Sequence, residues 1–232
     1  MMEETCKSGA CASFLTSSPD NFLTKFDFAA IDALDPSLDS ESTLAYDREI
    51  PMEIRLQDDD AHGPQDVGSL EAVRVKILVN AGSMVRMEIS SESDLFFHYS
   101  HIIDCKLFSD MQGTQKLMID FADYPSVLMK MLNSCLRDPS AFVAVFLMLR
   151  DGTGRLDFIQ NLEYKFVELL SVDLVQSCDE TVRKALSYRY NALKSKMALM
   201  QARLLEINAI VKTRNPALLT QLHQASLRRC RS

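Results

Sequence analysis

Histidines and carboxylates stand in short clusters that could carry chemistry. His98 and His101 lie three residues apart in an expected strand, so they point to opposite faces and are poorly placed to share a metal ion. Asp120 and Asp123 flank the end of another expected strand, where a capping or turn role is simpler than a paired-carboxylate acid/base site. Both clusters predict structural roles.

Two further patterns resemble binding motifs only in part. Gly152 and Gly154 lack the third glycine, the lysine and the following helix of a phosphate-binding loop, so they predict a turn. Cys6 and Cys11 are a weak signal for lipidation or metal binding, and exposed thiols are the simpler interpretation. No Ser, Cys and His grouping has a recognisable nucleophile turn. We therefore expect no enzyme, no cofactor and no resident metal.

Composition limits the class of protein. With 232 residues and 47% hydrophobic content, the chain can bury one core with appendages. The six cysteines form no C-x-x-C pair, which disfavours a disulfide framework and favours a reducing cytoplasm. The start of the chain is acidic and serine-rich, so we expect no targeting peptide. The longest apolar run is too short for a membrane span, and we expect no membrane partner.

Charge is distributed unevenly around the net value of −7. Residues 1–70 hold 15 acidic and 4 basic residues, whereas residues 183–232 hold 1 acidic and 11 basic residues. The basic end predicts either an acidic partner or a solvated helix face, and the sequence leaves both open. Within the acidic end, three phenylalanines (Phe22, Phe26 and Phe28) form either a short docking segment or a tail without a specific role.

Alternating apolar residues predict a meander of three antiparallel strands near the start of the ordered region. The strands are Ile50–Leu56, Val73–Val79 and Val85–Ile89, with a turn at 80–82. A nearly continuous apolar strand is expected at Phe142–Leu149 and two further strands at Leu156–Asn161 and Phe166–Val172, the first reached through a turn at residues 151–154.

The stretch between these strands alternates strands and helices. We expect a strand over 96–103, a short helix from Leu107 that stops at Gly113, and a strand over 115–121. A longer helix should start at Asp123-Tyr124-Pro125 and bury a stripe at 3.6-residue spacing over 127–136.

The last expected element is a long helix capped by Asp179 or Ser177. Apolar residues recur along it at alternating spacings of four and three, which is typical of a coiled-coil seam of about three and a half heptads. Asn215 and Pro216 should end it. The seam comprises Leu186, Tyr190, Leu193, Met197, Met200, Leu204, Ile207 and Val211.

Four strings in the middle of the chain resemble the head domain of the spindle assembly abnormal protein 6 family, the centriolar cartwheel proteins. They are D-L-F-F-H-Y, F-S-D-M-Q-G, L-M-I-D-F-A-D-Y-P and N-S-C-L, and weaker agreement extends from about residue 49 to about residue 200. Leu95 stands where the family usually has proline. The short helix makes the chain similar to the SAS-six-like branch, which lacks the long coiled-coil rod.

The resemblance implies a fold and a site. The fold is α+β: a small antiparallel β-barrel or sandwich with an inserted helical pair, like the heads of DNA end-joining scaffold proteins, and then a helix. In the family a hairpin aromatic projects into a neighbouring head, and the alignment places Tyr164 there, with Leu162 and Lys165 beside it. Without the resemblance, Tyr164 would be an ordinary surface tyrosine.

We therefore expect a structural protein of the cytoplasm and cytoskeleton. It would self-associate head to head and helix to helix at a centriole, basal body, flagellar base or related microtubule structure, with microtubule-associated or basal-body proteins as further partners. The expected parts are a disordered acidic segment (1–45), a head domain (46–176), a helix with the seam (177–213) and a basic tail (214–232). The alternative is a DNA-repair end-joining scaffold, although the interleaving of basic and apolar residues disfavours nucleic acid.

Overall fold

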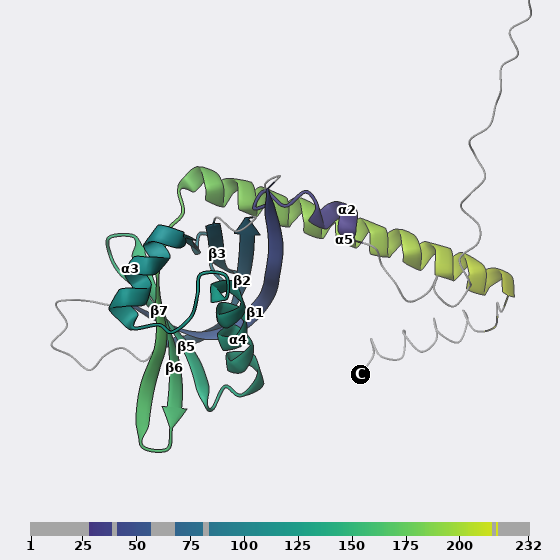
Figure 1. Ribbon diagram of the computed structural model, residues 1–232. Helices are drawn as coiled ribbons and strands as arrows, with labels where there is room; N and C mark the ends of the chain where they lie inside the picture. Colours follow the sequence, from purple (N-terminus) through teal and green to yellow (C-terminus); the bar gives the residue numbers. More distant parts are fainter. Residues whose placement is uncertain (1–27, 39–40, 57–67, 81–83, 215–216, 218–232) are drawn as a thin grey trace, which may run out of the picture. The chain divides into compact units, whose positions relative to one another are not determined.

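Seven β-strands follow one another around a closed barrel in this computed structural model (Figure 1). The structure describes residues 28–38, 41–56, 68–80, 84–214 and 217. The chain divides into two units, one of residues 33–192 and the other of residues 1–32 and 193–232. The strands are β1 (Ser42–Leu56), β2 (Ser69–Asn80), β3 (Met84–Ser91), β4 (His98–Asp104), β5 (Phe142–Met148), β6 (Thr153–Leu162) and β7 (Lys165–Gln176). The helices are α2 (Ala29–Asp32), α3 (Cys105–Gln115), α4 (Tyr124–Arg137) and α5 (Asp179–Arg214).

The barrel closes through a parallel strand pair. Around the barrel the order is β1-β2-β3-β4-β7-β6-β5, and every other neighbouring pair is antiparallel. Met52–Leu56 of β1 run parallel to Ala144–Met148 of β5. The expected α+β fold, a small antiparallel barrel with an inserted helical pair, is confirmed, and the structure adds the parallel pair at the closure. Closure removes the exposed edges that an open sheet would offer to other chains.

The inward-facing residues of the strands and one face of α4 form a single core. Tyr124, Leu128 and Leu132 of α4 are completely buried, as are Phe146 and Leu156 of the barrel wall. These α4 residues recur at the 3.6-residue period that the sequence shows, so the helix presents one apolar stripe to the barrel. Pro125 occupies the first turn, where its missing N–H costs no hydrogen bond. The predicted α4 is confirmed.

The segment expected as a strand over 115–121 is not one. α3 continues past Gly113 to Gln115 and ends at Lys116, whose φ of 55° is left-handed, and the following residues form a connection to α4. Leu117 and Ile119 pack against the core from this connection, which is why their alternation resembled a strand. The Gln112 side-chain amide donates to the carbonyl of Ile119 and holds the connection in place. The predicted stop at Gly113 is therefore also wrong.

The residues before the first expected strand are more ordered than predicted. β1 begins at Ser42 and α2 at Ala29, so the expectation of disorder to residue 45 is wrong for the described residues from 28 onward. The segment 33–38 lies against the outer faces of β2 and β3 through an ion pair between Asp35 and Lys76 and a hydrogen bond from Ser37 Oγ to Glu88 Oε2 (2.7 Å). Burial raises the pKa of Asp35, but hydrogen bonds from Lys76 and Ser37 outweigh this and lower it. Residues 1–27, and with them Cys6, Cys11, Phe22 and Phe26, lie outside the described residues.

Side chains complete the barrel wall where β4 and β7 separate. The two strands pair only at Tyr99 and Ser100. Beyond this point the side-chain amide of Gln115 replaces the missing strand partner. It donates to the carbonyl of Ser171 (2.7 Å) and accepts from the Ser171 N–H (3.0 Å). His101 Nδ1 lies 2.8 Å from the carbonyl of Asp173, and Nε2 lies 3.2 Å from the Tyr124 hydroxyl. Because a carbonyl can only accept, Nδ1 carries the proton and Nε2 accepts from Tyr124 in the neutral ring.

Gly154 is required by close packing within the barrel. A Cβ at this position would lie 2.4 Å from Cζ of Phe146, a ring that is itself completely buried. We predict that Gly154→Ala lowers the free energy of unfolding by about 1–3 kcal/mol through overpacking, measured by urea denaturation. Gly113→Ala is the matched control: a Cβ there meets nothing within 4 Å, and alanine in a helix should add about 0.5–1 kcal/mol. Equal effects of the two substitutions would contradict this account of the packing.

Buried histidine makes the fold sensitive to mild acid. Burial lowers the pKa of His101 from 6.5. The unfolded chain therefore binds more protons just below pH 6.5, so the stability contributed by the neutral ring is lost as pH falls through this range. We predict that the free energy of unfolding decreases from about pH 7 to about pH 5 and that His101→Gln shows a smaller decrease. Because burial also lowers the pKa of His98, His98 should account for the pH dependence that remains in His101→Gln. If the free energy of unfolding changes with pH in His101→Gln as it does in the wild type, the assignment is refuted.

Candidate interaction surfaces

The β6–β7 hairpin extends beyond the barrel (Figure 1). Apolar side chains at its tip are exposed. The strands stay paired up to Leu162 and Lys165, so that only Glu163 and Tyr164 form the turn. Pairing on both sides of a single irregularity at Phe158 and Ile159 makes the hairpin a rigid support, because the residues next to the turn are fixed by their partners. The Tyr164 side chain is 95% exposed. The tip is therefore preorganised, and its tyrosine is almost uncovered by the residues that the structure describes.

The three residues predicted at this site lie together, and the structure adds a fourth. Leu162, Tyr164 and Lys165 all occupy the tip and are all exposed. Phe166 was missed, although the residue is 69% exposed next to the tip, on the side of the hairpin opposite Leu162 and Lys165. In a regular strand over the expected range Phe166–Val172, Phe166 would lie on the same face as the buried Leu170.

A β-bulge explains this error. Phe158 pairs with Leu170 and Ile159 with Glu168, which leaves Leu169 as an extra residue without a partner. Since facing residues of an antiparallel pair share one side, the extra residue places Phe166 and Glu168 on the face opposite Leu170. Neither residue type nor alternation signals this bulge in the sequence.

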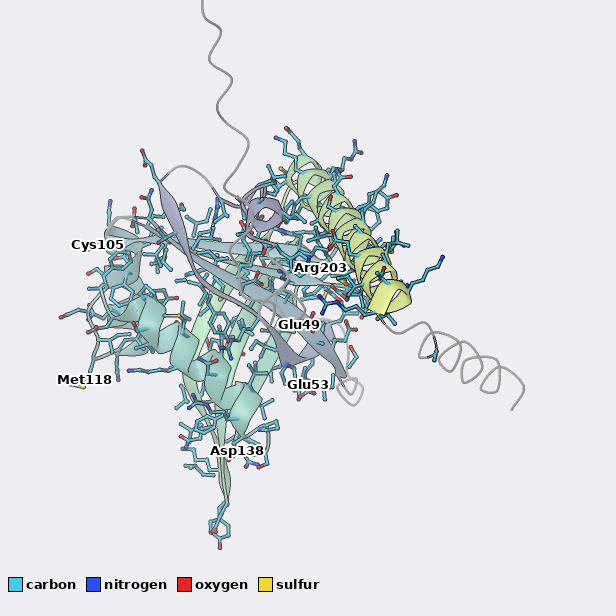
Figure 2. All side chains as sticks on the ribbon, turned by 90° about the vertical axis from the view of Figure 1, so that its right-hand side faces the viewer. Glu49, Glu53, Cys105, Met118, Asp138 and Arg203 are labelled. Carbon is cyan, nitrogen blue, oxygen red and sulfur yellow. The ribbon has the colours of Figure 1, made fainter. Side chains whose placement is uncertain are left out.

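The second apolar surface is the seam of α5. Its central members are substantially exposed, from 46% at Met200 to 69% at Leu193, whereas Leu186, Ile207 and Val211 are half-buried. The predicted seam residues thus lie on a helix as expected. Exposed apolar residues at heptad spacing indicate a contact surface rather than a core. Met118, on the connection between α3 and α4, is a further exposed apolar residue, and Figure 2 shows its side chain pointing outward.

The first turns of α5 are attached to the barrel. Val182 is buried, and the Arg189 guanidinium donates to the carbonyl of Ser91 at 3.2 Å. The predicted caps are wrong: the first helical hydrogen bond runs from Val182 N to Cys178 O, and the Cys178 thiol contacts the hydroxyl of Thr181. Ser177 instead contacts His98, with Oγ 2.9 Å from Nδ1.

Of the residues that could have done chemistry, His98, His101, Gly152 and Asp123 lie in the described part of the chain at structural positions. His98 and His101 contact different partners, and the described ranges contain no group of three or more His, Cys, Asp or Glu side chains that could hold a metal ion. Gly152 has a φ of 82° and forms the predicted turn, in which Asp151 accepts from Thr153 N at 2.9 Å. Asp123 lies in the turn before α4 without a capping hydrogen bond. Among the helices that the structure describes, none has the length and apolarity needed to cross a membrane.

Comparison with known proteins agrees with this architecture. Residues 44–174 match the family described as the centriolar protein SAS N-terminal domain. The spindle assembly abnormal protein 6 homolog of Danio rerio is 21% identical over 169 residues, which cover 69% of this chain and 27% of that protein. The chain thus spans about a quarter of the length of this relative.

Solved structures of such domains share the fold. An N-terminal fragment of Drosophila melanogaster Sas-6, dimerised via its coiled-coil domain, has a TM-score of 0.65 at 14% identity and covers 84% of this chain and 95% of its own. An N-terminal fragment of Leishmania SAS-6 with parts of its coiled coil has a TM-score of 0.62 at 16% identity. The match covers 77% of this chain and 99% of the fragment. The N-terminal coiled-coil dimer of C. elegans SAS-6 has a TM-score of 0.55 at 13% identity. The match covers 72% of this chain and 99% of that chain.

The barrel, the inserted helical pair and the following helix define an α+β head domain that continues into a helical stem. Because the family match covers more than half of the residues, the chain belongs to the SAS-6 N-terminal domain family.

The hairpin tip contributes surface rather than stability. Since Tyr164 and Phe166 are largely exposed, we predict that Tyr164→Ser and Phe166→Ser each change the free energy of unfolding of the monomer by less than about 0.5 kcal/mol in urea denaturation at low protein concentration. Leu156→Ala, at a completely buried position of the same hairpin, should cost about 2–5 kcal/mol. A comparable loss for Tyr164→Ser would mean that the tip supports the fold.

Proposed function

We propose that this protein is a non-enzymatic structural scaffold that self-associates through its head domain at a centriole, basal body, flagellar base or related microtubule structure. The observation that carries the proposal is the tip of the β6–β7 hairpin, where Tyr164 is almost fully exposed on a rigid support. Family membership supports the cellular setting, and related SAS-6 fragments described as dimers support self-association.

The head contact would work by burying the hairpin tip in a second copy. A protruding aromatic at the centre of a small interface can contribute about 2 kcal/mol or more, where 1.4 kcal/mol is tenfold in affinity. Leu162 and Lys165 pair with each other and lie on one side of the hairpin, whereas Phe166 lies on the other, so each side of the tip adds an exposed apolar side chain to Tyr164. The two strands already fix the backbone of the tip, so little conformational entropy is lost on binding.

The seam of α5 would supply a second, different contact between copies. Two distinct two-fold contacts on one protomer build an extended assembly, which closes only if the angle between them divides the circle. About three and a half heptads form a weak dimer, so we expect limited assembly rather than a full cartwheel. The basic tail from residue 214 lies almost wholly outside the described residues, and microtubule-associated or basal-body proteins stay its proposed partners.

The DNA-repair alternative has less support. Two of the basic side chains along α5 already meet carboxylates: Lys196 Nζ lies 2.8 Å from Asp32, and Arg203 lies 2.9 Å from Glu206. Phosphate binding would have to replace these pairs. The family match also favours a SAS-6-type scaffold.

We predict that Tyr164→Glu weakens association of the heads at least tenfold, because a buried carboxylate would lack a partner in the interface. Sedimentation equilibrium over a range of concentrations measures this. Tyr164→Phe keeps the aromatic ring and should associate like the wild type. Leu70→Glu is the matched control, since Leu70 is an exposed apolar residue at the start of β2 and away from the hairpin.

Equal self-association of Tyr164→Glu and wild type would refute the head contact. In cells, a tagged wild-type chain should coincide with a basal-body marker, and Tyr164→Glu should be recruited less. Absence of the wild-type chain from every such structure would remove the proposed location.

A further inference from the structure

A short segment before the barrel, here called the strap (residues 33–38), lies between the barrel wall and the start of α5. The strap, the barrel and the first turns of α5 up to Ala192 belong to one compact unit, although the family match covers only residues 44–174 of it. Asp35 is buried and pairs with Lys76 of β2. Asp35 Oδ1 also accepts from Ser37 N at 3.0 Å, and the Asp35 carbonyl accepts from Leu38 N at 3.0 Å, so the strap forms a tight turn around this carboxylate.

The strap is also attached to β3. Ser37 Oγ donates to Glu88 Oε2 at 2.7 Å, and the Arg86 guanidinium donates to the Ser37 carbonyl. Arg86 and the buried Glu88 pair with each other at 3.3 Å. Because β2 and β3 pair with each other over Val73–Asn80, these contacts hold the strap to a firmly paired part of the wall.

Lys76 links the strap to α5. Its ammonium lies 5.8 Å from the centre of the Tyr188 ring, a cation–π distance, while it pairs with Asp35. The side chains of Lys76 and Asp35 are 13% and 7% exposed, so salt and water screen this pair only weakly. The strap, the wall and α5 enclose a polar hollow of about 20 Å³, room for about one water molecule, so the three surfaces fit closely.

The first turns of α5 are therefore held on two faces. On one face Val182 is buried and the Arg189 guanidinium donates to the Ser91 carbonyl at 3.2 Å. On the neighbouring face Tyr188 and Leu34 of the strap line one open hollow. Successive residues of a helix are about 100° apart, so contacts at both faces oppose a rotation of the helix that contacts at one face would permit.

We propose that the strap positions α5 on the barrel, with Asp35 and Lys76 as the positioning residues. The consequence for assembly rests on the proposed function, in which one contact between copies lies on the hairpin of the barrel and the other on α5. In such an assembly the angle between the two contacts decides how the assembly curves and whether it closes. The strap sets this angle, although it takes part in neither contact.

Double electron–electron resonance tests the positioning within one copy. Spin labels are placed at Lys130 of α4 and Asn191 of α5, both exposed, in a full chain that keeps only the buried Cys135 among its own cysteines. An excess of unlabelled chain removes the distances between copies. We expect a single narrow distance distribution without further substitution, and loss of the single peak to a broader distribution in Asp35→Asn and in Lys76→Met.

A matched control separates positioning from general loosening. Asp35→Asn keeps an oxygen that can accept from Ser37 N and removes only the charge. Asp157 is a comparably buried carboxylate, but its partners Arg155 and Ser171 belong to β6 and β7. Asp157→Asn should therefore keep the single narrow peak. A single narrow peak in both strap variants, or equal broadening in Asp157→Asn, would overturn the proposal.

Curvature is tested separately with unlabelled chains. Sedimentation should show that Asp35→Asn associates like the wild type, since Tyr164 and the seam are intact, and electron microscopy should show assemblies of more varied curvature. Weaker association of Asp35→Asn, or assemblies with the curvature of the wild type, would contradict the role of the strap in assembly. If the wild type forms no assembly, the proposed function fails, and the spin-label distances still decide whether the strap positions α5.

Discussion

Closure of the barrel is the constraint on which the rest of the molecule depends. The parallel contact between β1 and β5 joins the first and last strands of the wall, and α4 supplies the stripe that completes the core inside it. A closed wall leaves no free edge along most of its circumference, so polar backbone groups are satisfied within the head. At the gap between β4 and β7, the Gln115 amide and the His101 ring replace the missing strand contacts. Contacts with other molecules are therefore left to side chains.

This arrangement separates stability from association. Completely buried residues such as Leu156 and Phe146 lie in the barrel, whereas the exposed Tyr164 lies on a turn that the same strands hold at a distance. The hairpin is rigid because its strands continue the barrel wall. The helix follows the same principle, with Val182 and Ala192 buried and the seam exposed. A substitution at either surface should thus leave the head folded.

Local patterns in the sequence predicted those elements whose formation is decided locally. Alternation over 73–79 and 85–89 gave β2 and β3, and the 3.6-residue stripe of Leu128 and Leu132 gave α4. The connection around Leu117 was misassigned because two residues that contact the core from an irregular segment imitate a short strand. The parallel closure could not be predicted, since it joins segments about 90 residues apart and no single residue type requires it. The tip was located from a family resemblance rather than from its own residues.

The bulge at Leu169 shows how one inserted residue can redesign a surface. Every residue between the bulge and the turn is rotated to the other side of the hairpin, while the strand beyond it, with Leu170 and Val172, keeps its place in the core. If Leu169 were paired regularly instead, the register of β7 would shift by one residue, and Phe166 would face Leu162 on the same side as Leu170. The composition of this surface thus depends on the register of one strand pair as well as on the identity of its residues.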